Sequence, residues 1–201
     1  MNRQFDHIYK VVYKHVTEKL KSLSPVYTYH CYEHTLDVLE QTQRIAKAEG
    51  LEDDESYFLL QMASLYHDTG FLFIYGGHEA KGCEIAKEEL PYFGVTDSQL
   101  EKICGMIMAT KIPQSPKNLS EEIICDADLD YLGRDDFEPI SNQLYKEFLE
   151  IGFVKNYDDW MQKQISFFES HHYFTKSSQL LRGPKKAAQL LKLKTYQPAG
   201  K

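Results

Sequence analysis

The chain has 201 residues, 42% of them hydrophobic, which is enough apolar material for one sizeable core. Its formal net charge of -7 argues against a protein that grips duplex nucleic acid, because that mode of binding needs a broadly basic face. No stretch approaches the roughly 20 apolar residues that span a bilayer, and the first residues lack the pattern of a secretory signal. We therefore expect a single cytoplasmic domain over residues 1–201, with no membrane partner.

Helical periodicity recurs almost throughout the chain, and short segments rich in glycine and proline divide it into about eight or nine helices. These breaks fall near residues 24–25, 50, 76–77, 91–94, 113–116, 152 and 183–184. No segment has a convincing two-residue strand period. The pattern predicts an all-α helical bundle, with a motif-bearing core over about 29–134 and C-terminal helices over 135–195.

Two histidines, His30 and His34, form the first candidate site in chain order. On a helix, residues four apart project from the same face one turn away from each other, so both imidazoles can share a site. The alternative is that one histidine packs in the core while the other is solvated. The pair becomes informative only together with the motifs that follow.

A second polar pair, His67-Asp68, follows the apolar run over 57–65. This run predicts a helix, and Asp53 or Asp54 can cap its start. Burying an ionised carboxylate beside an imidazole costs several kcal/mol unless a positive group compensates. A metal ion compensates both side chains at once. Adjacent residues near a helix end point about 100° apart, which suits two neighbouring positions on one ion. The alternative is that the dipeptide lies on the solvated surface, where it would not indicate a metal site.

Two aspartates follow in a third polar element, after expected helices over 77–89 and 96–109 and a proline-bounded loop over 111–117. Asp126 and Asp128 lie between aliphatic residues, where packing alone gives a helix little reason to carry them. A carboxylate is what a hard divalent cation held by two imidazoles and one carboxylate still needs. The alternative is a solvated acidic face.

The ordered set of these residues resembles the HD superfamily of metal-dependent phosphohydrolases, whose signature is H, HD and D on an all-α fold. The resemblance covers about residues 29–134. It implies a divalent metal ion bound by His34, His67, Asp68 and Asp128. Asp128 is preferred because the family's ligand directly follows Ala and precedes Leu or a basic residue. Asp126 is kept as the alternative ligand, or as an acceptor that orients a ligand or a water molecule.

Further roles come from the same resemblance. The segment 29–38 is similar to the opening motif of cyclic-nucleotide phosphodiesterases, which implies that His30 is the general acid, while Asp68 orients the attacking hydroxide. His78 is similar to a second-metal ligand of binuclear HD enzymes, but the further histidine of those enzymes is missing near 108–111. We therefore expect one metal ion, with His78, Lys111 and Arg134 contacting the substrate phosphate. For these three residues the alternative is a solvated position at the end of an element.

The resemblance implies a phosphohydrolase that attacks a phosphomonoester or phosphodiester, first of all a nucleotide or cyclic nucleotide, with metal-activated water. The metal stays open among Mn²⁺, Fe²⁺, Ni²⁺, Co²⁺, Zn²⁺ and Mg²⁺, although two imidazoles favour a transition metal over Mg²⁺. Two other functions share the fold: a catalytically idle signalling or scaffold domain, and a di-iron oxygenase, which needs more imidazole ligands than the sequence supplies. A homodimer is also left open.

Overall fold

The computed structural model describes residues 3–197, and these residues form nine α-helices and three short 3-10 helices without a strand, which confirms the predicted all-α fold. The helices are α1 (Arg3–Leu20), α2 (Tyr32–Ala48), α3 (Asp54–Tyr66), α4 (His78–Glu89), α5 (Asp97–Ala109), α6 (Leu119–Asp128), α7 (Phe137–Glu150), α8 (Tyr157–Ser170) and α9 (Lys176–Lys194). The 3-10 helices are η1 (Thr69–Leu72), η2 (Leu90–Phe93) and η3 (Asp130–Gly133). Among the described helices, none combines the length and apolarity that crossing a membrane requires.

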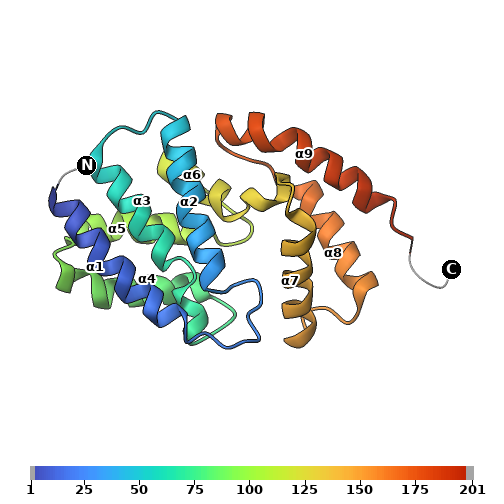
Figure 1. Ribbon diagram of the computed structural model, residues 1–201, viewed down its shortest axis with the longest axis horizontal. Coiled ribbons are helices and arrows are strands. Elements are labelled where there is room, and N and C mark those ends of the chain that lie inside the picture. The colour runs from blue at the N-terminus through green and yellow to red at the C-terminus, as the bar shows by residue number, and fades with distance from the viewer. Residues whose placement is uncertain (1–2, 198–201) are drawn as a thin grey trace.

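Helices α1 to α6 share one large hydrophobic core, and we call them the helical bundle (Figure 1). Helix α3 packs against α1, α2 and α5, and all its residues from Phe58 to Tyr66 are buried. Each fully buried side chain of the size of Phe58 or Leu65 stabilises the fold by about 1.5–3 kcal/mol. The predicted cap at Asp53 is confirmed, because its carboxylate accepts a hydrogen bond from the backbone N–H of Ser56. The core therefore fixes the end of α3, where the polar pair lies.

Helices α7, α8 and α9 lie beside the bundle, and we call them the C-terminal layer (Figure 1). Two smaller hydrophobic clusters hold this layer together, one around Phe137 and Phe168 and the other around Trp160. Helix α9 packs directly on η3, where a Cβ on Gly133 would come within 2.4 Å of the backbone oxygen of Arg182. Only glycine allows this close approach, so η3 links the end of α6 to the layer.

The break expected at Gly183-Pro184 is wrong, because α9 continues through both residues. Proline removes one backbone donor, and in a helix the carbonyl that loses its partner is that of Leu180, four residues earlier. Leu180 is exposed, so water can bind this carbonyl. Packing of α9 against η3 and α8 outweighs the local preference for a break.

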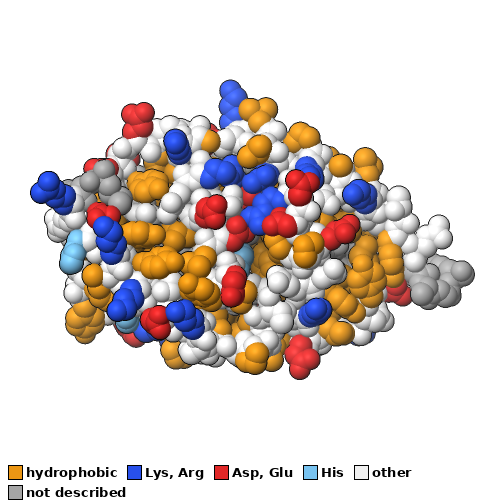
Figure 2. Space-filling view, viewed as in Figure 1, with side chains coloured by type: hydrophobic (Ala, Val, Ile, Leu, Met, Phe, Trp, Pro, Cys, Tyr) orange, Lys and Arg blue, Asp and Glu red, His pale blue; other side chains and the backbone are white. Residues whose placement is uncertain are grey.

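An ionic cluster joins the bundle to the C-terminal layer. The buried carboxylate of Asp130 accepts hydrogen bonds from Arg44 of α2 at 2.6 Å and from Arg182 of α9 at 2.9 Å. Figure 2 shows lysine and arginine side chains interspersed with acidic ones over this part of the surface. A buried carboxylate shared by two guanidinium groups fixes how the two parts meet, because removing one partner leaves an uncompensated charge.

Candidate metal centre

Three side chains from two separate segments converge at the ends of α2 and α3. His34 lies in the first turn of α2, and His67 and Asp68 directly follow α3. One Asp68 oxygen, Oδ2, lies 3.4 Å from His34 Nε2 and 3.2 Å from His67 Nε2. The three ligand-type atoms all lie within 4.8 Å of one another, so they can share one ion.

Local structure determines which atoms face the centre. The Nδ1–H of His67 donates a hydrogen bond to the carbonyl of Ser64 at 2.8 Å, which leaves Nε2 as the ring nitrogen directed at the cluster. The chain then turns through η1, where a Cβ on Gly70 would come within 2.0 Å of the carbonyl oxygen of His78. Glycine at this position lets η1 pack on the start of α4. The expected His-Asp pair at a helix end is therefore confirmed in position.

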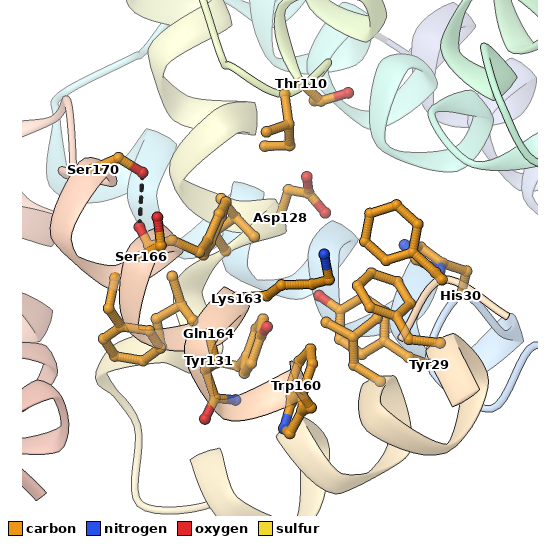
Figure 3. Close-up of a pocket in the computed structure, with 18 of the residues that line it drawn as sticks. Tyr29, His30, Thr110, Asp128, Tyr131, Trp160, Lys163, Gln164, Ser166 and Ser170 are labelled. Carbon is orange, nitrogen blue, oxygen red and sulfur yellow. Dashed lines mark hydrogen bonds between the residues drawn. The ribbon is translucent and has the colours of Figure 1, made fainter. Parts of the chain in front are cut away.

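Asp128, the last residue of α6, approaches the same histidines from a third segment. Its Oδ1 lies 3.1 Å from His34 Nε2 and 3.8 Å from His67 Nε2. The structure thus brings together all four residues that the sequence predicts as metal ligands. Figure 3 shows the carboxylate of Asp128 directed into a cavity that Asp68 also lines.

The electrostatics of the group fit a bound cation. His67 Nε2 and Asp68 Oδ2 are buried, and neither has a hydrogen-bond partner among the described residues. Burial opposes the charged form of His67, but Asp68 outweighs it and raises the pKa of His67 to about 9. Unpaired buried polar atoms cost about 1–3 kcal/mol each, and a divalent ion bound by both atoms would remove that cost. Mixed imidazole and carboxylate ligands suit a divalent transition metal.

His30 lies near the centre, although the expectation that it shares a helix with His34 is wrong. Helix α2 begins at Tyr32, so His30 lies in the preceding turn. The buried carboxylate of Glu147 in α7 accepts hydrogen bonds from the backbone N–H groups of Tyr29 at 2.9 Å and His30 at 3.1 Å, and it pairs with His30 Nδ1. These contacts satisfy the backbone without a helix. The rings of His30 and His34 are still only 6.0 Å apart.

Glu147 also sets the charge of His30. Burial alone would lower the pKa of His30, but the hydrogen bond with Glu147 and the nearby carboxylates outweigh burial and raise the pKa. Sequence reasoning missed Glu147, because a glutamate on an amphipathic helix is ordinarily solvated. Here its side chain is 0% exposed. Only the packing of α7 against the turn before α2 brings it into contact with His30.

His78 also reaches the centre, from the first turn of α4. Its Nε2 lies 3.6 Å from Asp68 Oδ1, and its Nδ1 donates to the carbonyl of Tyr75 at 3.1 Å. Phe71 stacks on this imidazole and on that of His30, at centroid distances of 3.9 and 4.3 Å. The geometry therefore leaves His78 Nε2 directed at the cluster, where it can contact a second ion or a substrate phosphate.

Asp126 lies outside the centre, two residues before Asp128 on α6. Its carboxylate accepts hydrogen bonds from the backbone N–H groups of Phe174 and Thr175, both at 2.8 Å, and from the Thr175 hydroxyl at 2.7 Å. Residues two apart on a helix point about 200° apart, so only one of the two aspartates can face the histidines. The geometry gives Asp126 a structural role, holding the segment that leads into α9, instead of the alternative ligand or orienting role.

The two cations expected to contact phosphate are not brought to the centre. Arg134 binds Asp37 at 2.7 Å and Asp136 at 2.6 Å, so its charge is already paired. Lys111 is exposed on the loop after α5 and does not line the cavity, whereas its neighbours Thr110 and Ile112 do. Both expectations failed because side-chain direction in a loop or at an element end cannot be read from the sequence.

A cavity of about 690 Å³ adjoins the centre, between the bundle and the C-terminal layer. Asp68, His78, Asp128 and His30 line one end of it. From α8, Lys163 extends its ammonium group into the cavity, toward the side where Asp128 and His30 lie (Figure 3). Sequence analysis did not find Lys163, since a lysine on a polar helix face carries no signal that distinguishes it from a solvated one.

Fold and site together define an all-helical protein with a candidate histidine–aspartate metal centre. Residues 31–131, about half of the chain, match the family model of the HD domain. The chain therefore belongs to the HD domain family. The matched range contains all four predicted metal ligands, but it ends before α7 and α8, which supply Glu147 and Lys163.

Two solved structures share this fold. A predicted HD superfamily hydrolase from an uncultured Thermotogales bacterium has a TM-score of 0.60 and 18% identity, over 94% of this chain and 89% of that chain. A protein from Lactobacillus plantarum has a TM-score of 0.68 and 18% identity, over 97% of this chain and 95% of that chain. Curated protein sequences gave no match. Both structural similarities extend through the C-terminal layer as well as the bundle.

Proposed function

We propose that this protein is a metal-dependent phosphohydrolase that hydrolyses a phosphomonoester or phosphodiester by attack of water on phosphorus. The observation that carries the proposal is a group of two histidines and two aspartates whose carboxylates, those of Asp68 and Asp128, line the same cavity as His30. The ring of His30 is in turn paired with Glu147. A hydrolase of this kind needs a cation for the phosphoryl oxygens and an acid for the leaving oxygen. Membership of the HD domain family supports the same function.

The metal-binding residues in this proposal are His34, His67, Asp68 and Asp128. When bound, the ion supplies positive charge for the phosphoryl oxygens and makes water acidic enough to be deprotonated near neutral pH. Asp68 accepts a hydrogen bond from the attacking water and so orients it.

In this proposal, His30 protonates the leaving oxygen. Its Nδ1 is held by Glu147, which leaves Nε2 as the nitrogen that donates a proton to the departing oxygen. Glu147 stabilises the imidazolium before donation. Lys163 and His78 border the same cavity and can contact the phosphate oxygens. The proposal therefore transfers to Lys163 the phosphate contact that the sequence assigned to Lys111 and Arg134.

A direct test measures metal content and turnover on the purified chain. We expect about one transition-metal ion per chain, and turnover of p-nitrophenyl phosphate or bis-p-nitrophenyl phosphate that is lost with a chelator and restored by metal. Nucleotides and cyclic nucleotides, the first candidates from the sequence, are assayed in the same panel. A folded, metal-loaded protein that hydrolyses none of these esters would contradict the proposal and favour the idle scaffold domain.

The His30→Ala variant separates the acid from the ligands. We expect it to keep its metal and to lose about 100- to 10,000-fold in kcat, the usual range for a general acid. The loss should be smaller for p-nitrophenyl esters, whose leaving group needs little protonation, than for alkyl esters. Loss of metal together with rate would make His30 a ligand and refute its role as acid.

A further inference from the structure

The cavity beside the metal centre extends between α7 and α8, and this extension is walled by apolar side chains. We define the apolar chamber by Leu132, Leu144, Phe148, Trp160, Phe167 and Phe168. Because Asp68 and Asp128 line the same cavity, one molecule can place a phosphate at the centre and another group in the chamber. Resting on the phosphohydrolase function, we propose that the substrate is a phosphomonoester of a bulky, apolar alcohol, whose organic part binds in the apolar chamber.

The chamber offers few hydrogen bonds to a polar ligand. Of the six residues that define the chamber, only Trp160 carries a polar side-chain group, the indole N–H. Gln164 lines the same cavity, but its amide donates to the hydroxyl of Ser141. Three further uncharged polar residues of α8 line the cavity but are exposed to solvent: Gln162, Ser166 and Ser170. Tyr29 and Tyr131 also line it, and their hydroxyl groups hydrogen-bond to each other. Each base or sugar group left unpaired in such a chamber costs roughly tenfold in affinity, so an apolar group is preferred to a nucleoside.

The charges around the cavity favour a single phosphate. Lys163 is the one lysine or arginine among the described residues that line it, and its Nζ lies 3.7 Å from Asp159 Oδ1. Two further carboxylates besides the metal ligands, Glu79 and Asp159, also line the cavity. A triphosphate brings several negative charges, which this balance does not compensate. The negative charge of one phosphate can be compensated by a metal ion together with Lys163.

Kinetics on matched esters test the inference with the metal-loaded protein. Ethyl phosphate and 2-phenylethyl phosphate release chemically similar primary alcohols, so their ratio of kcat/KM isolates binding of the phenyl ring. We expect 2-phenylethyl phosphate to be better by about ten- to hundredfold, as burial of an aromatic ring predicts. AMP and ATP should be poorer than 2-phenylethyl phosphate. Equal values for the two alkyl esters, or AMP better by tenfold, would overturn the inference and leave the phosphohydrolase proposal standing.

A binding measurement separates the two proposals if no ester is hydrolysed. Trp160 is the single tryptophan of the chain and lines the chamber, so its fluorescence reports occupancy without turnover. With the metal-loaded protein, 3-phenylpropylphosphonate should change the emission and bind at least about tenfold more tightly than propylphosphonate. Equal affinities would refute the chamber as the site. A clear difference without any hydrolysis would refute only the enzymatic proposal.

Substitution of Phe153 locates the effect at the chamber. Phe153 lines the cavity, packs on Phe148 at a centroid distance of 4.6 Å and is 54% exposed, so the protein should tolerate Phe153→Ser. We expect the preference for 2-phenylethyl over ethyl phosphate to fall by about threefold to tenfold. The control is Tyr92→Ser, an exposed aromatic residue on η2 outside the cavity, which should leave the preference unchanged. An equal effect of both substitutions would overturn the assignment.

Discussion

The bundle and the C-terminal layer contribute to one cavity, but their functional residues differ in how well they are satisfied. In the bundle, His67 Nε2 and Asp68 Oδ2 are buried 3.2 Å apart without a hydrogen-bond partner among the described residues, and a bound cation would serve both atoms. In the layer, Glu147 already accepts hydrogen bonds from Tyr29 and His30, and Lys163 is 44% exposed. Buried polar atoms that lack a hydrogen-bond partner indicate a binding site by themselves. A side chain that is already hydrogen-bonded or solvated indicates one only when the fold brings it to the cavity.

The same contrast appears within α6, where Asp126 and Asp128 face opposite ways. Burial raises the pKa of Asp126 despite its hydrogen bonds from residues 174–175, so its environment resists charge. Asp128 instead meets two imidazoles. One helix thus serves the layer with one face and the metal centre with the other, which is how the two regions are held in register.

The largest expected effect comes from removing the shared carboxylate of the centre. We expect Asp68→Ala to abolish metal retention and activity together, because Asp68 Oδ2 lies within 3.4 Å of both histidines. Metal content by atomic emission and turnover of bis-p-nitrophenyl phosphate measure the two losses. Retention of a full complement of metal would show that the histidines and Asp128 suffice, and would refute the assigned role.

The two aspartates of α6 should give opposite results. Asp128→Asn should lose metal affinity by about 100-fold or more, because an amide oxygen is a weaker ligand than a carboxylate. Asp126→Asn should keep its metal and lower the free energy of unfolding by about 1–3 kcal/mol, because one of its buried acceptors is lost. Metal titrations and thermal unfolding distinguish the two. Weaker metal binding in Asp126→Asn without loss of stability would reverse the assignment.

A smaller effect is expected from Glu147→Gln, which tests how the layer supports the bundle. Loss of the carboxylate removes the contact that raises the pKa of His30, so that pKa should fall. A general acid must be protonated, so activity declines as the pH rises through its pKa, and the alkaline limb of the pH–rate profile should move to lower pH. We also expect kcat to fall about tenfold. Metal content should not change.

Glu150→Gln serves as the control for this prediction, since Glu150 lies on the same helix and is exposed. It should leave both the profile and kcat as they are. If Glu147→Gln lowers kcat without moving the alkaline limb, Glu147 acts through the fold alone, and the proposed link between Glu147 and proton donation fails.

The bundle and the C-terminal layer also differ in how much of their structure the sequence predicts. The all-α fold could be predicted because apolar residues recur with helical period. The candidate ligands could be predicted because His67-Asp68 ends an otherwise apolar helix and because the ordered motifs resemble those of the HD superfamily. The positions of Glu147 beside His30 and of Lys163 in the cavity could not be predicted, because both residues lie on amphipathic helices where charged residues are usual. Arg134 and Lys111 were misassigned because a residue's nearness in sequence does not fix the direction of a long side chain.

The smallest effect is expected at Lys163, and it decides whether the layer contacts the phosphate of the substrate. Its side chain is half-exposed and shares its charge with Asp159, so solvent screens the attraction to a phosphate. Interactions of this kind contribute about 1 kcal/mol or less, so Lys163→Gln should raise KM by up to about fivefold and leave kcat nearly unchanged. Lys146→Gln is the control, because Lys146 lies on α7, is exposed and does not line the cavity.

Added salt should weaken substrate binding in the wild type more than in Lys163→Gln, since only the wild type has this charge to screen. Equal KM values for both variants would mean that the metal centre holds the phosphate without help from the C-terminal layer.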